Sequence, residues 1–319
     1  MAKEIFYQRR TSSKQVRAQI KFYYSEKFFN KWMNKYEYPE LNYQQKHYIM
    51  KKWWAVGTIA CSRISSADPV LAGLLASGEV DMKENDVIFT PWTFAKRYNI
   101  YDFPTHAQLI NTRGVKFITP TILEVDKEVV LGWAQKNHKS VYSSIEAKLE
   151  ELVDIEMKKR VARKAQSQPW MFAFSPEDIK QAQALQQALE NDEPYMFAPF
   201  NEVDKVKGIQ SGAPYIVDKF EQDRQKIEND ILTMLGVNNV GIGEKKEHLI
   251  VDEVNANNED IEQQSVSFKS EIEDFFERVD KVLGYKVHVI DLNEMFKEAE
   301  DEVDEKEEQP DESQSSDEN

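Results

Sequence analysis

The chain has 319 residues, of which 41% are hydrophobic and 11% aromatic, enough to bury a core in one large or two modest domains. Its longest uncharged apolar run, residues 53–62, is far shorter than the roughly 20 residues of a membrane span, and no apolar signal region opens the chain, so we expect a soluble protein without membrane contact. The single cysteine, Cys61, excludes an intrachain disulfide and a Cys-rich zinc site, and its apolar neighbours predict a buried structural thiol.

The net charge of −15 is concentrated at the C-terminal end. Residues 291–319 hold fourteen Asp and Glu against two Lys, which leaves only about −3 for the remaining residues. Residues 1–55 instead hold twelve Lys and Arg against four Glu, interleaved with aromatic side chains. This pattern is compatible with phosphate contacts, but charge alone favours an ordinary solvated helix face. The candidates for such contacts are Arg9, Arg10, Lys14 and Arg17.

Residues 13–35 and 42–63 have the helical spacing of aromatic and aliphatic side chains. The stretch VIFTPWTFAKRYNIYDFP, residues 87–104, is rich in β-formers and is punctuated by proline, which is typical of short strands. The region 1–143 is therefore predicted to mix α and β structure.

Two helices of similar length are predicted at 144–166 and 213–236. The second has Pro214 in its first turn and Gly236 at its end. The segment 167–212 between them predicts a small module of strand, helix and strand, at 169–174, 176–191 and 194–200. We expect an antiparallel helix pair that carries this module, which is too small for a nucleotide-binding fold.

A long loop is predicted at 237–258, where the sequence is rich in Gly, Asn and charge. Loops longer than about 12–15 residues are usually functional or disordered. A third helix with a broad apolar face follows from residue 259 and ends at Gly284, and YKVHVIDLN after it alternates like a half-buried strand. Residues 297–319 have almost nothing to bury and are predicted to be disordered.

The sequence lacks the common catalytic motifs: a P-loop, a dinucleotide-binding glycine motif, a nucleophile elbow and HExxH. Its five histidines are scattered without metal-ligand spacing. The stretch VDEVNANNED, residues 251–260, lacks the residue order of a calcium loop, and its Asx residues more simply cap the third helix. We therefore expect no enzyme activity, no cofactor and no metal.

Residues 212–262 contain three motifs in order: APYIVDK, the helix end LGV, and EKKEHLIVDEVN. In this order and spacing they resemble the portal protein, also called the head-tail connector or upper collar protein, of small short-tailed double-stranded DNA bacteriophages. Fainter collinear similarity includes TPTILE, PYMFAP and a small-residue helix with the sequence IAC at Cys61. The resemblance extends over about residues 130–290.

The resemblance implies a portal-type fold, mostly α with small α+β parts, in a homo-dodecameric ring whose central channel serves DNA packaging and ejection. The parts implied are a wing at 1–143 and 259–296, stem helices at 144–166 and 213–236, a clip at 167–212, a channel loop at 237–258 and an acidic tail at 297–319. The implied partners are double-stranded DNA, a packaging ATPase, the major capsid and scaffold proteins, and the lower collar and tail proteins. The implied location is the capsid vertex of the virion, after assembly in the host cytoplasm.

The resemblance also implies basic rings in the channel, since Lys219, Lys245 and Lys246 occupy matching motif positions. A further family lysine corresponds to Gln210, so a ring is expected there only if Lys207 replaces it. A channel with few lysines suits a conduit, because many phosphate contacts would bind DNA too tightly for sliding.

The alternative is a monomeric or dimeric nucleic-acid-binding adaptor without enzyme activity. It would use the basic, aromatic N-terminus, and its two long helices would form a coiled coil. In a portal, the same N-terminal residues would contact nucleic acid or the packaging motor.

Overall fold

The computed structural model describes residues 13–77, 87–167, 170–173, 207–210, 215–239 and 251–292. The chain divides into two compact units. Unit 1 comprises Met1–Ile20 and Glu150–Ile227, and unit 2 comprises Lys21–Leu149 and Glu228–Asn319. The described residues are mostly helical with small sheets, which confirms the predicted fold class.

The centre of unit 2 is a three-stranded antiparallel sheet. Strand β2 (Thr58–Arg63) lies between β3 (Val87–Thr90) and β7 (Val129–Trp133), so that Cys61 is opposite Phe89 on one side and Val130 on the other. The predicted burial of Cys61 is confirmed, because its side chain is fully covered.

A second antiparallel sheet joins β4 (Trp92–Phe94), β5 (His106–Leu109) and β6 (Ile122–Glu124). Two short helices, α3 (Ile64–Ala67) and α4 (Pro69–Ala76), follow β2. Apolar side chains from these helices and from both sheets form one core cluster, which buries Ala60, Ile64, Leu71, Leu109, Leu123 and Leu131 among others. The strands predicted within 87–104 are thus present as β3 and β4.

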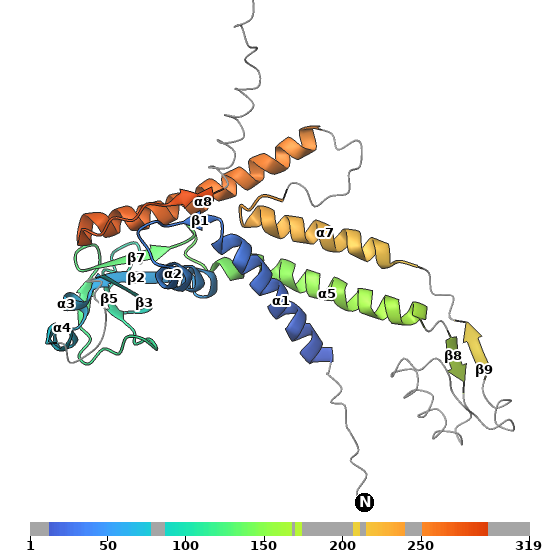
Figure 1. Ribbon diagram of the computed structural model, residues 1–319, viewed down its shortest axis with the longest axis horizontal. Helices are drawn as coiled ribbons and strands as arrows, with labels where there is room; N and C mark the ends of the chain where they lie inside the picture. Colours follow the sequence, from blue (N-terminus) through green and yellow to red (C-terminus); the bar gives the residue numbers. More distant parts are fainter. Residues whose placement is uncertain are drawn as a thin grey trace, which may run out of the picture. The chain divides into compact units, whose positions relative to one another are not determined.

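An aromatic core joins three helices in unit 2: the C-terminal part of α1 (Ser13–Met33), α2 (Tyr43–Ala55) and α8 (Val251–Leu283). The ring centroids of Trp32 and Phe268 are 5.9 Å apart, and those of Trp53 and Phe275 are 5.8 Å apart. Aromatic pairs at such distances add to the stabilisation from burial. Helix α8 lies along β7 (Figure 1), and β1 (Tyr36–Glu37) pairs with β10 (Ile290–Asp291).

Two long helices dominate unit 1, to which they contribute residues 150–167 of α5 (Val141–Ser167) and 217–227 of α7 (Val217–Met234). They lie side by side and run antiparallel (Figure 1), since Lys159 pairs with Glu221 and Glu156 with Arg224. Beyond them, β8 (Trp170–Ala173) pairs with β9 (Lys207–Gln210) in an antiparallel ladder.

The prediction of one helix over 42–63, including a small-residue helix at IAC, is wrong. Helix α2 ends at Ala55, and residues 58–63 form strand β2. Gly57 separates them with a φ of +89°, and a Cβ there would lie 2.6 Å from the backbone of Lys139. Periodicity alone does not distinguish a short buried apolar run in a strand from one in a helix.

The helix boundaries at three other places also differ from the prediction. Helix α5 begins at Val141 rather than 144, because the Ser140 hydroxyl accepts a hydrogen bond from the Ser143 backbone N–H and caps the helix. Helix α7 begins at Val217 rather than 213, with Asp218 in its first turn, where a negative charge is favourable.

The third helix begins at Val251, so residues 251–258, with the Asx residues expected to precede it as caps, lie within the helix and not in the predicted loop. This segment has no Gly or Pro, and Asn and Asp disfavour a helix only weakly. In the described part of the strand predicted after Gly284, residues 285–292, only Ile290–Asp291 forms a strand.

In the predicted small module, the first strand is present as β8. The predicted helix at 176–191 and strand at 194–200 lie outside the described residues. The partner of β8 that the structure describes is β9, which the sequence did not predict.

Candidate functional site

Arg17, Lys21 and Lys27 of α1 form ion pairs with acidic side chains of other helices. In unit 1, Arg17 Nη1 lies 2.7 Å from Asp154 Oδ1, and its Nη2 lies 3.6 Å from Glu150 Oε2. In unit 2, Lys21 pairs with Glu146 at 3.0 Å and Lys27 pairs with the buried Glu228 at 2.8 Å. Much of the basic face predicted from the sequence is therefore neutralised within the chain.

The four N-terminal candidates have different surroundings. Arg17 is engaged with α5, whereas Lys14 is exposed on the first turn of α1. Arg9 and Arg10 lie outside the part of the chain that the structure describes.

A charged seam joins α5 and α7 in unit 1. The Nζ of the buried Lys159 lies 2.8 Å from Glu156 Oε1 and 2.9 Å from Glu221 Oε2, and Arg224 Nε donates to Glu221 Oε1 at 2.9 Å. The hydrogen bond from Arg224, assisted by Lys159, outweighs the effect of burial and lowers the pKa of Glu221 to about 2. Glu221 therefore stays ionised at neutral pH, and its ion pairs link the two helices side by side.

Of the predicted channel lysines, Lys219 is exposed on α7, and Gln210 and Lys207 both lie in β9. Lys245 and Lys246 fall in the segment 240–250, which is not among the described residues.

The structure also exposes basic residues near the C-terminal end of α5 that were not chosen from the sequence: Lys158, Arg160 and Arg163. The run KKRVARK, residues 158–164, is the sequence signal by which this basic cluster could have been found. Cations near a helix C-terminus interact favourably with the helix dipole, which is a sufficient structural reason for them.

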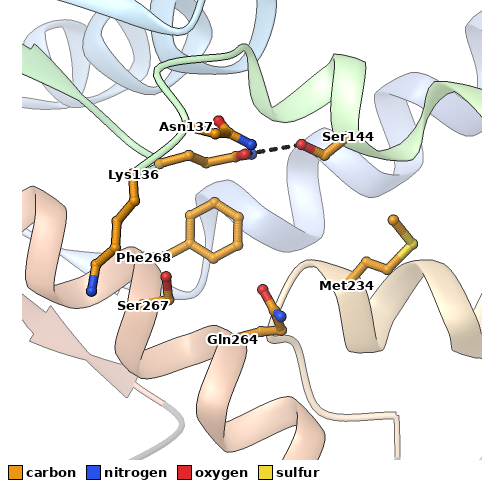
Figure 2. A pocket seen from close by; sticks show the side chains of 8 residues that line it. Lys136, Asn137, Ser144, Met234, Gln264, Ser267 and Phe268 are labelled. Atoms are coloured by element: carbon orange, nitrogen blue, oxygen red, sulfur yellow. Dashed lines mark hydrogen bonds between the residues drawn. The ribbon is translucent and has the colours of Figure 1, made fainter.

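A cavity of about 290 Å³ opens in unit 2, and Figure 2 shows its lining side chains. The Ser144 hydroxyl donates to Gln135 Oε1 at 2.9 Å across one wall. Its lining residues are Gln135, Lys136, Asn137, Ser144, Met234, Gln264, Ser267 and Phe268. This set has amides, hydroxyls and one ammonium group, but it pairs no nucleophile with a general base.

The described residues contain no group of three or more His, Cys, Asp or Glu side chains placed to hold a metal ion. His288 pairs with Glu40, and His138 stacks on Trp133 with ring centroids 4.1 Å apart. Burial lowers the pKa of His138, which favours its neutral form. No helix in the described ranges is both long enough and apolar enough to span a bilayer.

Comparison with known proteins assigns the class. A family model described as Phage Connector (GP10) matches residues 7–296, so the chain belongs to the phage connector family. This confirms the resemblance inferred from the sequence motifs. The protein has a portal or connector role and is a virion component, and the adaptor alternative is not favoured. Proteins of this family are generally structural and associate with the capsid and the tail.

Two solved structures resemble the chain. A chain in "Portal and tail of native bacteriophage P68" has 14% sequence identity and a TM-score of 0.41, with 92% of this chain and 95% of that chain covered. An HK97 family phage portal protein from Corynebacterium diphtheriae has 9% identity and a TM-score of 0.43, with 85% of this chain and 92% of that chain covered.

Proposed function

We propose that about twelve copies of this chain form a ring around a channel through which double-stranded DNA passes during packaging and ejection. The observation that carries the proposal is the match to the phage connector family over residues 7–296, nearly the whole chain. The antiparallel pair of α5 and α7 supports it, because the ion pairs between the two helices give a stiff element suited to a channel wall.

In this proposal the parts of the chain have the roles that the resemblance implies. Residues 144–166, which belong to α5, and residues 213–236, which include α7, form the stem, and residues 167–212 form the clip. Residues 1–143 and 259–296 form the wing, and 297–319 form an acidic tail. The channel loop lies within 237–258, although helix α8 already begins at Val251.

The chain has no nucleotide-binding motif, so we propose that it catalyses no reaction and that the energy for DNA translocation comes from a packaging ATPase docked on the ring. The other proposed partners are the major capsid and scaffold proteins and the lower collar and tail proteins. Assembly would take place in the host cytoplasm.

Native mass spectrometry and negative-stain microscopy of the purified full chain test the ring. We expect a ring-sized species with a central hole. The variant Ile227→Asp should lose the ring while circular dichroism shows retained helix, since it places a charge on a half-buried position of α7. A monomer or dimer of the parent chain would contradict the proposal.

The channel lysines are tested with Lys245→Ala/Lys246→Ala in a packaging assay that measures passage of DNA into the capsid and its later loss separately. A band of lysines repeated around a ring would hold phosphates briefly, so we expect normal assembly and packaging but several-fold faster loss of packaged DNA. The control Lys281→Ala/Lys286→Ala removes equal charge from exposed wing positions and should retain DNA like the parent. Equal retention in the loop variant and the parent would exclude this role.

A further inference from the structure

Helix α7 ends in a tight turn that leaves no room for a side chain. Gly236 has a φ of +62°, its N–H donates to Thr233 O at 2.9 Å, and the Val237 N–H donates to Leu232 O at 2.9 Å. This is the Schellman pattern of helix termination. A Cβ on Gly236 would lie 2.6 Å from the backbone N of Ser265, so the end of α7 is in direct contact with α8.

A buried ion pair lies at the same point. Lys35 Nζ would be 3.0 Å from a Cβ on Gly236 and is 3.5 Å from Asp291 Oδ2, and the two charged side chains are 1% and 0% exposed. The Ser265 hydroxyl donates to the same carboxylate oxygen at 2.7 Å. The ammonium group thus lies between a carboxylate and the C-terminal end of a long helix, where the partial negative charge of the last carbonyls favours a cation.

Further hydrogen bonds hold the backbone next to this ion pair. The Leu292 N–H donates to Lys35 O at 2.9 Å beside the ladder of β1 and β10. The side-chain amide of Asn239 donates to Asn229 O at 3.3 Å and to Thr233 Oγ1 at 3.1 Å, which folds residues 236–239 back against α7. Four segments distant in sequence therefore fix the path of the chain as far as residue 239.

We propose that the Lys35–Asp291 pair, with Ser265, is a positioning element that sets the point and direction in which the chain leaves α7 towards residues 240–250. A buried ion pair is a poor source of net stability, because apolar residues of similar volume often stabilise as well or better. The ion pair instead specifies one arrangement, because Lys35 and Asp291 can meet only when Gly236, α8 and β10 are correctly placed relative to one another. The consequence for DNA retention rests on the proposed function of Lys245 and Lys246.

The test replaces both charges with near-isosteric neutral groups, Lys35→Met/Asp291→Asn, so that no lone charge is left buried. Hydrogen exchange is measured on the full chain. We expect amides 236–239 to exchange about tenfold faster and the amides of α2 to be unchanged. Without the ion pair this segment opens locally more often, while the rest of unit 2 stays folded. The control Lys21→Met/Glu146→Gln removes another ion pair of unit 2 and should leave amides 236–239 as in the parent.

Unchanged exchange at 236–239, or an equal rise throughout unit 2, would overturn the positioning role. If the double variant does not fold, Ser265→Ala, which removes one hydrogen bond to Asp291, should still raise exchange at 236–239 selectively. In the packaging assay the double variant should lose DNA faster while rings remain intact. If Lys245→Ala/Lys246→Ala has no effect on retention, the proposed loop function fails, whereas the positioning role is decided by the exchange rates alone.

Discussion

A single carboxylate joins helix α4 to the segment that precedes β6 in unit 2. Asp68 is buried, and its Oδ1 caps α4 by accepting from the N–H groups of Val70 and Leu71, each at 3.1 Å. Its Oδ2 accepts from the N–H of Ile118 and, at 2.8 Å, from that of Thr119. Burial acts to raise the pKa of Asp68, but the hydrogen bonds from Leu71, Thr119 and Ile118 outweigh it, so the pKa is lowered.

This lowered pKa gives a signed prediction. The folded protein holds the Asp68 carboxylate at a lower pKa than the unfolded chain does, so its stabilisation is complete above the unfolded pKa of about 3.9 and is lost as pH falls through the folded pKa. Urea unfolding of Asp68→Asn should therefore show a smaller loss of stability on acidification than the parent. Asp68→Ala should cost about 2–4 kcal/mol at pH 7 through the lost cap and the unpaired N–H groups. Identical pH profiles for the parent and Asp68→Asn would contradict this account.

At the scale of elements, the packing of α8 on the central sheet depends on a missing side chain. A Cβ on Gly132 of β7 would lie 2.4 Å from the ring of Phe275. Arg278 Nη2 also donates to Leu131 O at 2.9 Å, which ties the helix to the same strand. The Phe275 ring thus packs directly against the backbone of β7, and the hydrogen bond of Arg278 lies one helical turn further along α8.

We expect Gly132→Ala to displace Phe275 and to cost about 1–3 kcal/mol of unfolding free energy, as is usual for overpacked cores. The matched control is Gly73→Ala in α4, where nothing lies within 4 Å of the added methyl group and the helix should gain up to about 1 kcal/mol. Chemical denaturation measures both. Equal effects from the two variants would show that the Gly132 contact relaxes without cost.

The elements that the sequence predicted well are those with long amphipathic patterns, such as α1, α5 and α7. The errors have local physical causes. Strand β2 was assigned to a helix because Ile59, Ala60 and Cys61 are all buried and show no alternation. The predicted loop at 237–258 is too long because the polar residues from Val251 onward already belong to α8. The pairing of β8 with β9 joins segments too far apart in sequence for local patterns to reveal.

The candidate site was predictable only in part. The motifs that identified the family lie in consecutive residues and needed no structure. The surroundings of Arg17 were not predictable, because its partners Glu150 and Asp154 are more than 130 residues away in the sequence. Charge patterning alone therefore overstated the basic surface of the N-terminal helix.

At the scale of the whole molecule, the basic N-terminal end and the acidic C-terminal end can be tested separately by deletion. The basic residues that precede the paired Arg17 in the sequence are Lys3, Arg9, Arg10 and Lys14. Deletion of 1–12 removes three of them, and each lost phosphate contact should reduce the salt slope of DNA binding by about 0.9. Fluorescence anisotropy over a range of salt concentrations measures this slope.

Deletion of 297–319 serves as the contrasting variant. That segment has almost no apolar side chains to contribute to packing, so we expect rings of unchanged size in native mass spectrometry. If the chain without 1–12 binds DNA with the slope of the full chain, the N-terminus is a solvated face. Loss of rings on removal of 297–319 would show that the acidic segment takes part in assembly.

The covered thiol in the central strand makes selective labelling practical. Burial raises the pKa of Cys61 well above its ordinary value, and the side chain has neighbouring strands on both sides, so maleimides do not reach a reactive thiolate in the folded protein. Because it is the only cysteine, a second one introduced at an exposed position such as Gln222→Cys would carry a fluorophore alone, with the native residue left in place. If the proposed ring forms, distances between dyes on α7 in its different subunits then become measurable with the rest of the sequence unaltered.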